Sequence, residues 1–167
     1  EHYEKLNSQL TTTNNAFDLL ERLSKGVDYF FNHRVTSVNR AQQEGNAVPQ
    51  SNKIVLAFLS PNKAIIDLTS VEGKNLFNTA IAQAMGEKVD IKNQEQVNEF
   101  IEGLKAKGID DVATKLIEAT EINDELFEEI KPFVKEGAVA LQALIEYGRS
   151  LKADQTAFET AIYIEAD

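Results

Sequence analysis

Hydrophobic side chains recur at alternating steps of three and four along residues 3–38. The stripe consists of Tyr3, Leu6, Leu10, Thr13, Phe17, Leu20, Ser24, Val27 and Phe31, and Val35 and Val38 continue it. This spacing places side chains on one face of an α-helix. It predicts one long helix within residues 1–44 that buries this face against other helices. Gly26 weakens the prediction, because a glycine inside a helix costs about 1 kcal/mol relative to alanine.

Residues 45–52 interrupt the pattern with Gly45 and Pro49 and are expected to form a loop. The apolar run Ile54–Leu59 that follows fits either a buried strand or one to two buried helical turns. We favour the helical interpretation, because the neighbouring sequence offers no clear partner strand. Ser60 and Pro61 then have the character of a helix start, which predicts a short helix through residues 64–68.

Shorter helical patterns occupy the rest of the chain. Their start and stop signals are a capping box from Thr69 to Glu72, a stop at Gly86, N-caps at Asn93, Asp110 and Asn123, and a break at Pro132. A further helix is expected over residues 139–151. Asp154 caps a last segment with Phe158 and Ile162, for which a terminal strand at residues 161–164 is the alternative. The sequence therefore predicts an all-α helical bundle with a long N-terminal helix and several shorter amphipathic helices.

Length and composition are those of one ordinary domain. The prediction is a single helical domain over residues 1–167, with a long helix at 1–44, a loop at 45–52 and a short-helix bundle at 53–167. The apolar runs are too short to span a bilayer, so no transmembrane segment is expected. The chain begins at Glu1 and not with methionine, which predicts that a leader, a tag or another domain is missing upstream. The sequence indicates no compartment.

Motifs that carry chemistry are missing from the sequence. There is no cysteine, and the two histidines, His2 and His33, lie about thirty residues apart on the predicted helix. No Glu-x-x-His pair, phosphate-binding glycine loop or nucleophile elbow occurs. We therefore predict no catalytic residues, no metal ligands and no cofactor, and a protein that is not an enzyme.

Charge is distributed unevenly along the chain. Residues 1–89 carry nine acidic and nine basic side chains, whereas residues 90–167 carry eighteen acidic and eight basic ones. The acidic stretch includes Glu118, Glu121, Glu125, Glu128 and Glu129, which predicts either an acidic partner-binding surface or a solvated helix face. Lys115, Lys131 and Lys135 are spaced to relieve part of the repulsion. No cluster of Lys and Arg is evident, so the prediction excludes nucleic acid as a partner.

Two functions remain after these exclusions. The first is a non-enzymatic structural or protein-interaction bundle that binds a protein partner or itself. Its partner face would consist of Leu6, Leu10, Phe17, Leu20, Val27 and Phe31. Narrower variants are an acidic mimic of nucleic acid and a membrane-active helical protein. The second is a helical small-molecule or lipid-binding protein with a Phe-lined core built from Phe58, Phe77, Phe100, Phe127 and Phe133.

Overall fold

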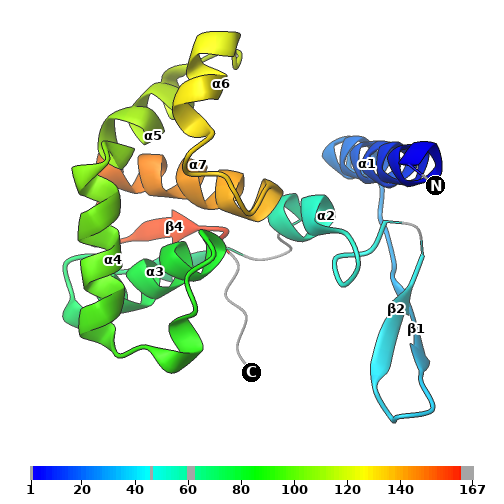
Figure 1. Ribbon diagram of the computed structural model, residues 1–167. Helices are drawn as coiled ribbons and strands as arrows, with labels where there is room; N and C mark the ends of the chain where they lie inside the picture. The colour runs from blue at the N-terminus through cyan, green and yellow to red at the C-terminus, as the bar shows by residue number, and fades with distance from the viewer. Residues whose placement is uncertain (1, 46, 60–62, 163–167) are drawn as a thin grey trace. The chain divides into compact units, whose positions relative to one another are not determined.

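The computed structural model describes residues 2–45, 47–59 and 63–162, and this part of the chain is mostly helical (Figure 1). The predicted all-α class with a long N-terminal helix is therefore confirmed. Strands add two small antiparallel sheets, each of two strands. The chain groups into two compact units, residues 1–59 (unit 1) and residues 60–167 (unit 2), which we describe separately. The single domain remains a prediction.

Unit 1 consists of two helices and a β-hairpin. Its elements are α1 (His2–Ser24), β1 (Asn32–Val35), β2 (Ala41–Glu44) and α2 (Lys53–Phe58). Its small core is formed by Ala16, Leu19, Ala47 and Val55, with Leu23, Phe31, Ile54 and Leu59 packed against them. The helical interpretation of Ile54–Leu59 is confirmed, because α2 covers all but its last residue.

The first helix ends twenty residues before the predicted boundary at residue 44, which corrects the extent of that helix. Gly26 adopts a left-handed φ of 75°. The amide of Val27 donates to the carbonyl of Arg22 at 3.2 Å, and that of Gly26 donates to the carbonyl of Leu23 at 2.9 Å. This pair of bonds is a Schellman motif, which satisfies the last carbonyls of a helix and turns the chain away from its axis. Gly26 is therefore a stop signal and not a tolerated interior glycine.

Strands β1 and β2 form an antiparallel hairpin in place of the predicted helix end. The register pairs Val35 with Ala41 and Arg34 with Gln42. A bond from the Thr36 amide to the Arg40 carbonyl, at 2.9 Å, extends the pairing into the loop. Asn39 supports the turn with a φ of 57°, a conformation that asparagine tolerates better than most residues. Val35 and Val38 are consequently exposed and do not continue a helical stripe.

Asn52 joins the two helices of unit 1. Its side-chain oxygen accepts hydrogen bonds from the amides of Ile54 and Val55 at 3.0 and 3.2 Å, which caps α2. Its side-chain amide donates to the carbonyl of Thr12 in α1 at 3.1 Å. The residue is buried, so one polar side chain both starts α2 and ties it to α1.

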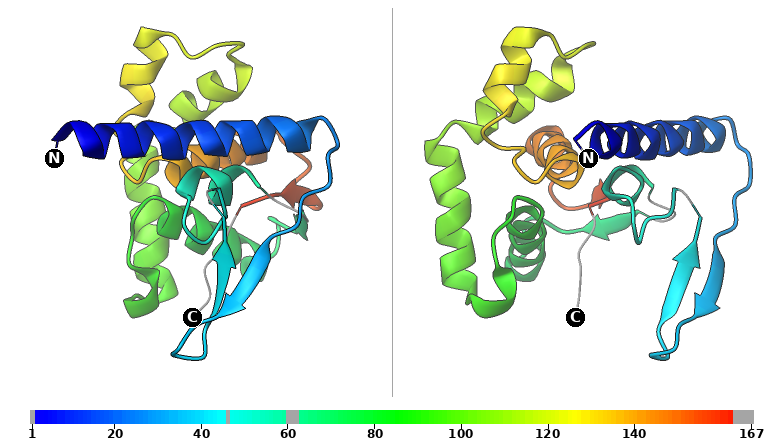
Figure 2. Two further views of the ribbon diagram at one scale, coloured as in Figure 1. Left: turned by 90° about the vertical axis from the view of Figure 1, so that its right-hand side faces the viewer. Right: turned by 45° about the vertical axis from the view of Figure 1, so that its right-hand side comes forward.

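Unit 2 is a helical array around a larger apolar core (Figures 1 and 2). Its elements are β3 (Ala64–Ile66), α3 (Val71–Ala84), the 3₁₀ helix η1 (Val89–Ile91), α4 (Gln94–Ala106), α5 (Ile109–Glu118), α6 (Asp124–Ile130), α7 (Ala138–Lys152) and β4 (Phe158–Thr160). Helix α7 packs on both α3 and α5. The core includes Phe77, Ile81, Ile101, Ile109, Leu144 and Phe158.

The predicted helix caps of unit 2 are partly confirmed. Asn93 caps α4 in a full capping box with Gln96, and Asn123 caps α6 through the amide of Leu126 at 2.9 Å. The cap of α3 is Ser70 and not Thr69. The predicted cap at Asp110 is wrong, because α5 already begins at Ile109. The expected break near Pro132 and the helix over residues 139–151 are both confirmed.

The short helix predicted for residues 64–68 is wrong. Residues 64–66 form β3, which pairs antiparallel with β4, so that Ile66 lies opposite Phe158. The expected last helical segment at Phe158 is therefore also wrong, since Phe158 belongs to a strand. Part of the alternative strand at residues 161–164 and the start signal at residues 60–61 lie outside the described residues.

Candidate functional site

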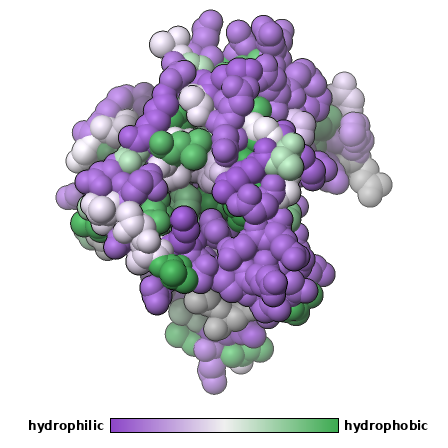
Figure 3. Space-filling view, turned by 90° about the vertical axis from the view of Figure 1, so that its left-hand side faces the viewer, coloured by the Kyte–Doolittle hydropathy of each residue, from purple (hydrophilic) through white to green (hydrophobic). Residues whose placement is uncertain are grey.

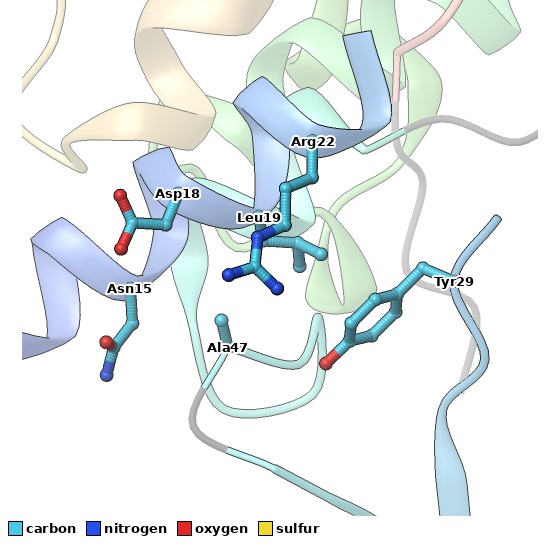
Figure 4. A pocket seen from close by; sticks show the side chains of 6 residues that line it. All are labelled: Asn15, Asp18, Leu19, Arg22, Tyr29 and Ala47. Carbon is cyan, nitrogen blue, oxygen red and sulfur yellow. The ribbon is translucent and has the colours of Figure 1, made fainter. Parts of the chain in front are cut away.

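A pocket of about 230 Å³ opens on unit 1 between α1 and the chain that follows it (Figure 4). It is lined by Asn15, Asp18, Leu19, Arg22, Tyr29 and Ala47. Asn15 and Leu19, and Asp18 and Arg22, are each four positions apart, which places the four helical residues on one side of α1. Leu19 and Ala47 are buried and form an apolar floor, while the other side chains supply polar groups at its rim.

Arg22 and Tyr29 give this pocket its chemistry. Figure 4 shows the guanidinium of Arg22 and the hydroxyl of Tyr29 pointing toward the same space beside Ala47. Asn15 adds an amide, and Asp18 is the one acidic side chain that lines the pocket. No described carboxylate forms an ion pair with Arg22. A guanidinium with free donors next to a phenol suits a phosphate or carboxylate group.

The hairpin that follows the pocket lies in a stretch of unit 1 that is poor in acidic residues. From residue 29 to residue 59 the only acidic side chain is Glu44, which lies 3.4 Å from the guanidinium of Arg34. Arg34 also donates to the side-chain oxygen of Gln42 at 3.4 Å. Arg40 is exposed and has no ion-pair partner among the described residues. Unit 1 as a whole carries six acidic and six basic residues, so the whole net charge of −10 lies in unit 2.

A second, shallower hollow of about 610 Å³ lies on unit 2 between α3 and α4. Asn98 organises its polar lining by accepting hydrogen bonds from Asn78 at 3.0 Å and from Gln94 at 3.2 Å. Glu95, Glu99 and Glu102 add negative charge. Figure 3 shows that the face of unit 2 around α4 is mainly hydrophilic, with small hydrophobic groups between the polar ones.

Glu146 is a buried carboxylate of unit 2 whose hydrogen bonds are all structural. It accepts from Thr160 at 2.7 Å, from the amide of Ala161 at 3.3 Å and from Arg149 at 2.5 Å. These bonds attach β4 to α7. Nearby, Tyr147 donates to Asp110 at 2.7 Å, and burial together with this bond raises the pKa of the Tyr147 hydroxyl. These hydrogen bonds of both groups therefore stay within unit 2 and hold its own elements together.

The predicted partner face is not one continuous helical stripe. Leu6, Leu10 and Phe17 lie exposed on α1, and Leu20 is half-buried there. Val27 and Phe31 lie beyond the end of α1, because the Schellman motif redirects the chain. The side of α1 that packs within unit 1 is instead the one carrying Ala16 and Leu19. The partner face remains a prediction.

The predicted acidic surface is partly neutralised by lysines. Lys115 bridges Glu129 and Asp111 at 2.9 and 3.0 Å, and Lys131 binds Glu128 at 2.9 Å. The remaining predicted residues are exposed: Glu118 is paired with Lys152, whereas Glu121 and Glu125 have no described partner. The spacing argument is therefore confirmed for Lys115 and Lys131. Whether this surface receives a partner remains a prediction.

The Phe-rich positions of the predicted core are divided between the two units. Phe77 and Phe133 are buried in the core of unit 2, whereas Phe127 is half exposed. Phe58 belongs to α2 in unit 1. Over the described residues there is no group of three or more acidic or histidine side chains placed to hold a metal ion. None of the described helices is long and apolar enough to cross a membrane.

Comparison with known proteins changes the functional interpretation. No family model matches the chain. The virion DNA-directed RNA polymerase of Enterobacteria phage N4 is 30% identical to it over 154 aligned positions, which cover 84% of this chain. The chain spans only 4% of the length of that polymerase.

This similarity overturns three predictions. A relative that is a DNA-directed RNA polymerase contradicts the non-enzymatic structural or ligand-binding protein, and it contradicts the prediction that the chain is not an enzyme. It also contradicts the exclusion of nucleic acid as a partner. That exclusion rested on the absence of a Lys and Arg cluster in the sequence, whereas the structure places Arg34 and Arg40 on one β-hairpin. The acid-poor stretch from residue 29 onward was the signal in the sequence that could have found the hairpin surface.

Proposed function

We propose that this chain is a unit of a virion DNA-directed RNA polymerase and serves DNA-directed RNA synthesis within that larger polypeptide. The observation that carries the proposal is the 30% identity to the phage N4 polymerase, which extends over most of this chain. A similarity confined to one short motif would not suggest a shared unit, whereas this one runs through both compact units.

The structure supports a role as a folded unit. Unit 2 has a continuous core and capped helices, so it can hold a defined shape inside a longer chain. Unit 1 adds a polar pocket and a basic hairpin, which are features that the DNA or RNA of a polymerase could contact.

A segment exchange tests the proposal directly. The matching segment of the phage N4 polymerase would be deleted, or replaced by residues 1–167 of this chain, and template-dependent RNA synthesis measured on DNA. We expect the deletion to lower RNA synthesis and the replacement to restore a substantial part of it. If the replacement performs no better than the deletion although the chimera is folded, the proposal is wrong.

The control for folding is a replacement that carries Gly148→Val. This substitution disrupts the contact between α5 and α7, because even a methyl group at position 148 would lie 2.5 Å from the carbonyl oxygen of Ala113. Loss of the rescue in this variant alone would show that the folded unit, and not merely the length of the segment, supports RNA synthesis.

A further inference from the structure

We propose that unit 1 binds single-stranded nucleic acid through one face of the β1–β2 hairpin, with Arg34 and Arg40 on the phosphates and Phe30 stacked on a base. This inference rests on the proposed function and names the class of ligand that this part of the chain would take. The hairpin face is defined here as Arg34, Arg40 and Gln42, on the side of the hairpin that also carries Glu44. Phe30 lies on the segment just before β1.

The register of the hairpin places both arginines on the same face. Arg34 is opposite Gln42, and Arg40 lies two residues before Gln42 in a pairing that continues through the Thr36–Arg40 bond. Cross-strand neighbours on this diagonal are about 7–8 Å apart, so one phosphate chain can contact both guanidiniums.

The outer edge of β2 is held against the loop at residues 47–50, together with the Gln43 side chain, which lies on the opposite side from Arg34. The amide of Gln43 donates to the side-chain oxygen of Gln50 at 2.7 Å, and the amide of Gln50 donates back to the side chain of Gln43 at 3.2 Å. Since neighbouring residues in a strand point to opposite sides, this contact leaves the face with Arg34 free for a ligand.

The low number of acidic residues around the hairpin favours a polyanion at this face. Glu44 is the one acidic residue between positions 29 and 59, and its carboxylate forms an ion pair with Arg34 at 3.4 Å. Arg40 has no described counter-ion. Arg22 provides a third cation in the pocket that Tyr29 lines, directly before Phe30 in the chain. Unit 2, with its net charge of −10, repels phosphates.

Phe30 indicates that the bound strand is single. Its ring is 85% exposed, whereas Tyr29 and Phe31 hold each other edge to face with their centroids 5.1 Å apart. An exposed aromatic ring on the segment that leads into the arginine-bearing strand β1 can serve as a stacking platform for an unpaired base. In a duplex each base is already stacked between its neighbours, so the Phe30 ring would find no free base to stack on.

The test measures binding of the intact chain to a labelled oligonucleotide of about 15 nucleotides by fluorescence anisotropy, over a range of salt concentrations. Separate titrations use single-stranded DNA, single-stranded RNA and the duplex. We expect binding of the single strands with a log–log salt slope of about −2, corresponding to phosphate contacts by Arg34, Arg40 and the third cation, Arg22.

Two variants and their matched controls test the face itself. Arg34→Gln with Arg40→Gln should weaken binding at least about tenfold and reduce the salt slope to about −0.7. Phe30→Ala should weaken it by about tenfold with the slope unchanged. Lys135→Gln removes a cation from unit 2, and Phe127→Ala removes a half-exposed ring from unit 2, so both controls should bind as wild type does. Circular dichroism verifies that each variant is folded.

The results separate this inference from the proposed function. Failure of the wild-type chain to bind either single strand, tighter binding of the duplex, or wild-type binding by the double arginine variant would each overturn the inference. The segment exchange decides the proposed function independently. If a replacement that carries both arginine substitutions restores RNA synthesis, the proposed function is supported, and the hairpin face is not needed for it.

Discussion

Two single residues, Asn52 and Gly148, determine how helices pack in this chain. Asn52 caps α2 with its side-chain oxygen and holds α1 with its side-chain amide. Gly148 lets α7 approach α5 so closely that an added Cβ would lie 2.5 Å from the Ala113 oxygen. The sequence marks neither role, because both depend on a neighbour distant in the chain.

Two substitutions separate the roles of Asn52. Asn52→Ser keeps an oxygen that caps α2 but loses the bond to Thr12, so the free energy of unfolding of unit 1 should fall by about 1 kcal/mol. Asn52→Ala also loses the cap and should lose about a further 1 kcal/mol. Urea unfolding of the full chain, followed by circular dichroism, measures both values. Equal stability of the two variants would show that the cap contributes nothing.

Gly148 and Gly103 form a matched pair of helical glycines. Gly148→Ala should destabilise unit 2 by about 1–3 kcal/mol, because the new methyl group meets the backbone of α5. Gly103 lies in α4 with nothing within 4 Å of an added Cβ, so Gly103→Ala should stabilise it by up to about 1 kcal/mol. Thermal unfolding of both variants provides the comparison. A stabilising Gly148→Ala would contradict the close approach of the two helices.

At the scale of elements, the sequence predicts what is local. The caps at Asn93 and Asn123, the stop at Gly86 and helix α7 each depend on residues within a few positions, and all were predictable. Strand β3 was not, because its partner β4 lies more than ninety residues away. The hairpin was missed for a different reason: the steps of three and four continue through Val27 and Phe31 although the Schellman motif at Gly26 has already ended α1.

Two similar turns join the β3–β4 pair to its surroundings and make it sensitive to acid. Asp67 accepts hydrogen bonds from the hydroxyl and the amide of Thr69 at 2.6 and 2.8 Å, and Asp154 accepts the same pair from Thr156 at 2.7 and 2.9 Å. The hydroxyl bond is the main cause that lowers the pKa of Asp67, and the amide bond is the main cause for Asp154. The amide of Leu68 also donates to the carbonyl of Gln155, which links the two turns.

These lowered pKa values predict a pH dependence of stability. The folded state favours the charged carboxylates, so this stabilisation is present above their ordinary pKa of 3.8 and is lost as the pH falls through the lower folded values. Asp67→Asn with Asp154→Asn should flatten the decline of the melting temperature between about pH 5 and pH 2. Glu121→Gln, at an exposed position without a described partner, is the control. An unchanged acid decline in the double variant would contradict a role for the two turns.

At the scale of the whole molecule, the two units differ in how much they bury. The core of unit 1 contains two alanines among its four buried members, whereas the larger core of unit 2 is built mainly from aromatic and large aliphatic side chains. The candidate site lies in the smaller unit. Composition alone could not indicate it. In the total for residues 1–89, the acidic residues of α1 cancel the charge of the arginines in the hairpin, so the sum is neutral.

The difference in burial predicts a difference in local stability. Burial of apolar surface is the main source of folding free energy, so unit 1 should open more readily than unit 2. In native-state hydrogen exchange of the full chain, amides in α1 should exchange faster than the central amides of α7. Equal protection of the two helices would contradict this expectation.

The uneven distribution of charge has a consequence for the ions around the molecule. Unit 2, with ten excess negative charges, gathers a cloud of cations around itself. Unit 1 is neutral overall and gathers few ions of its own. Any counterions released when a polyanion binds to unit 1 therefore come from the polyanion. The salt dependence of binding would then report the number of arginines that contact its phosphates.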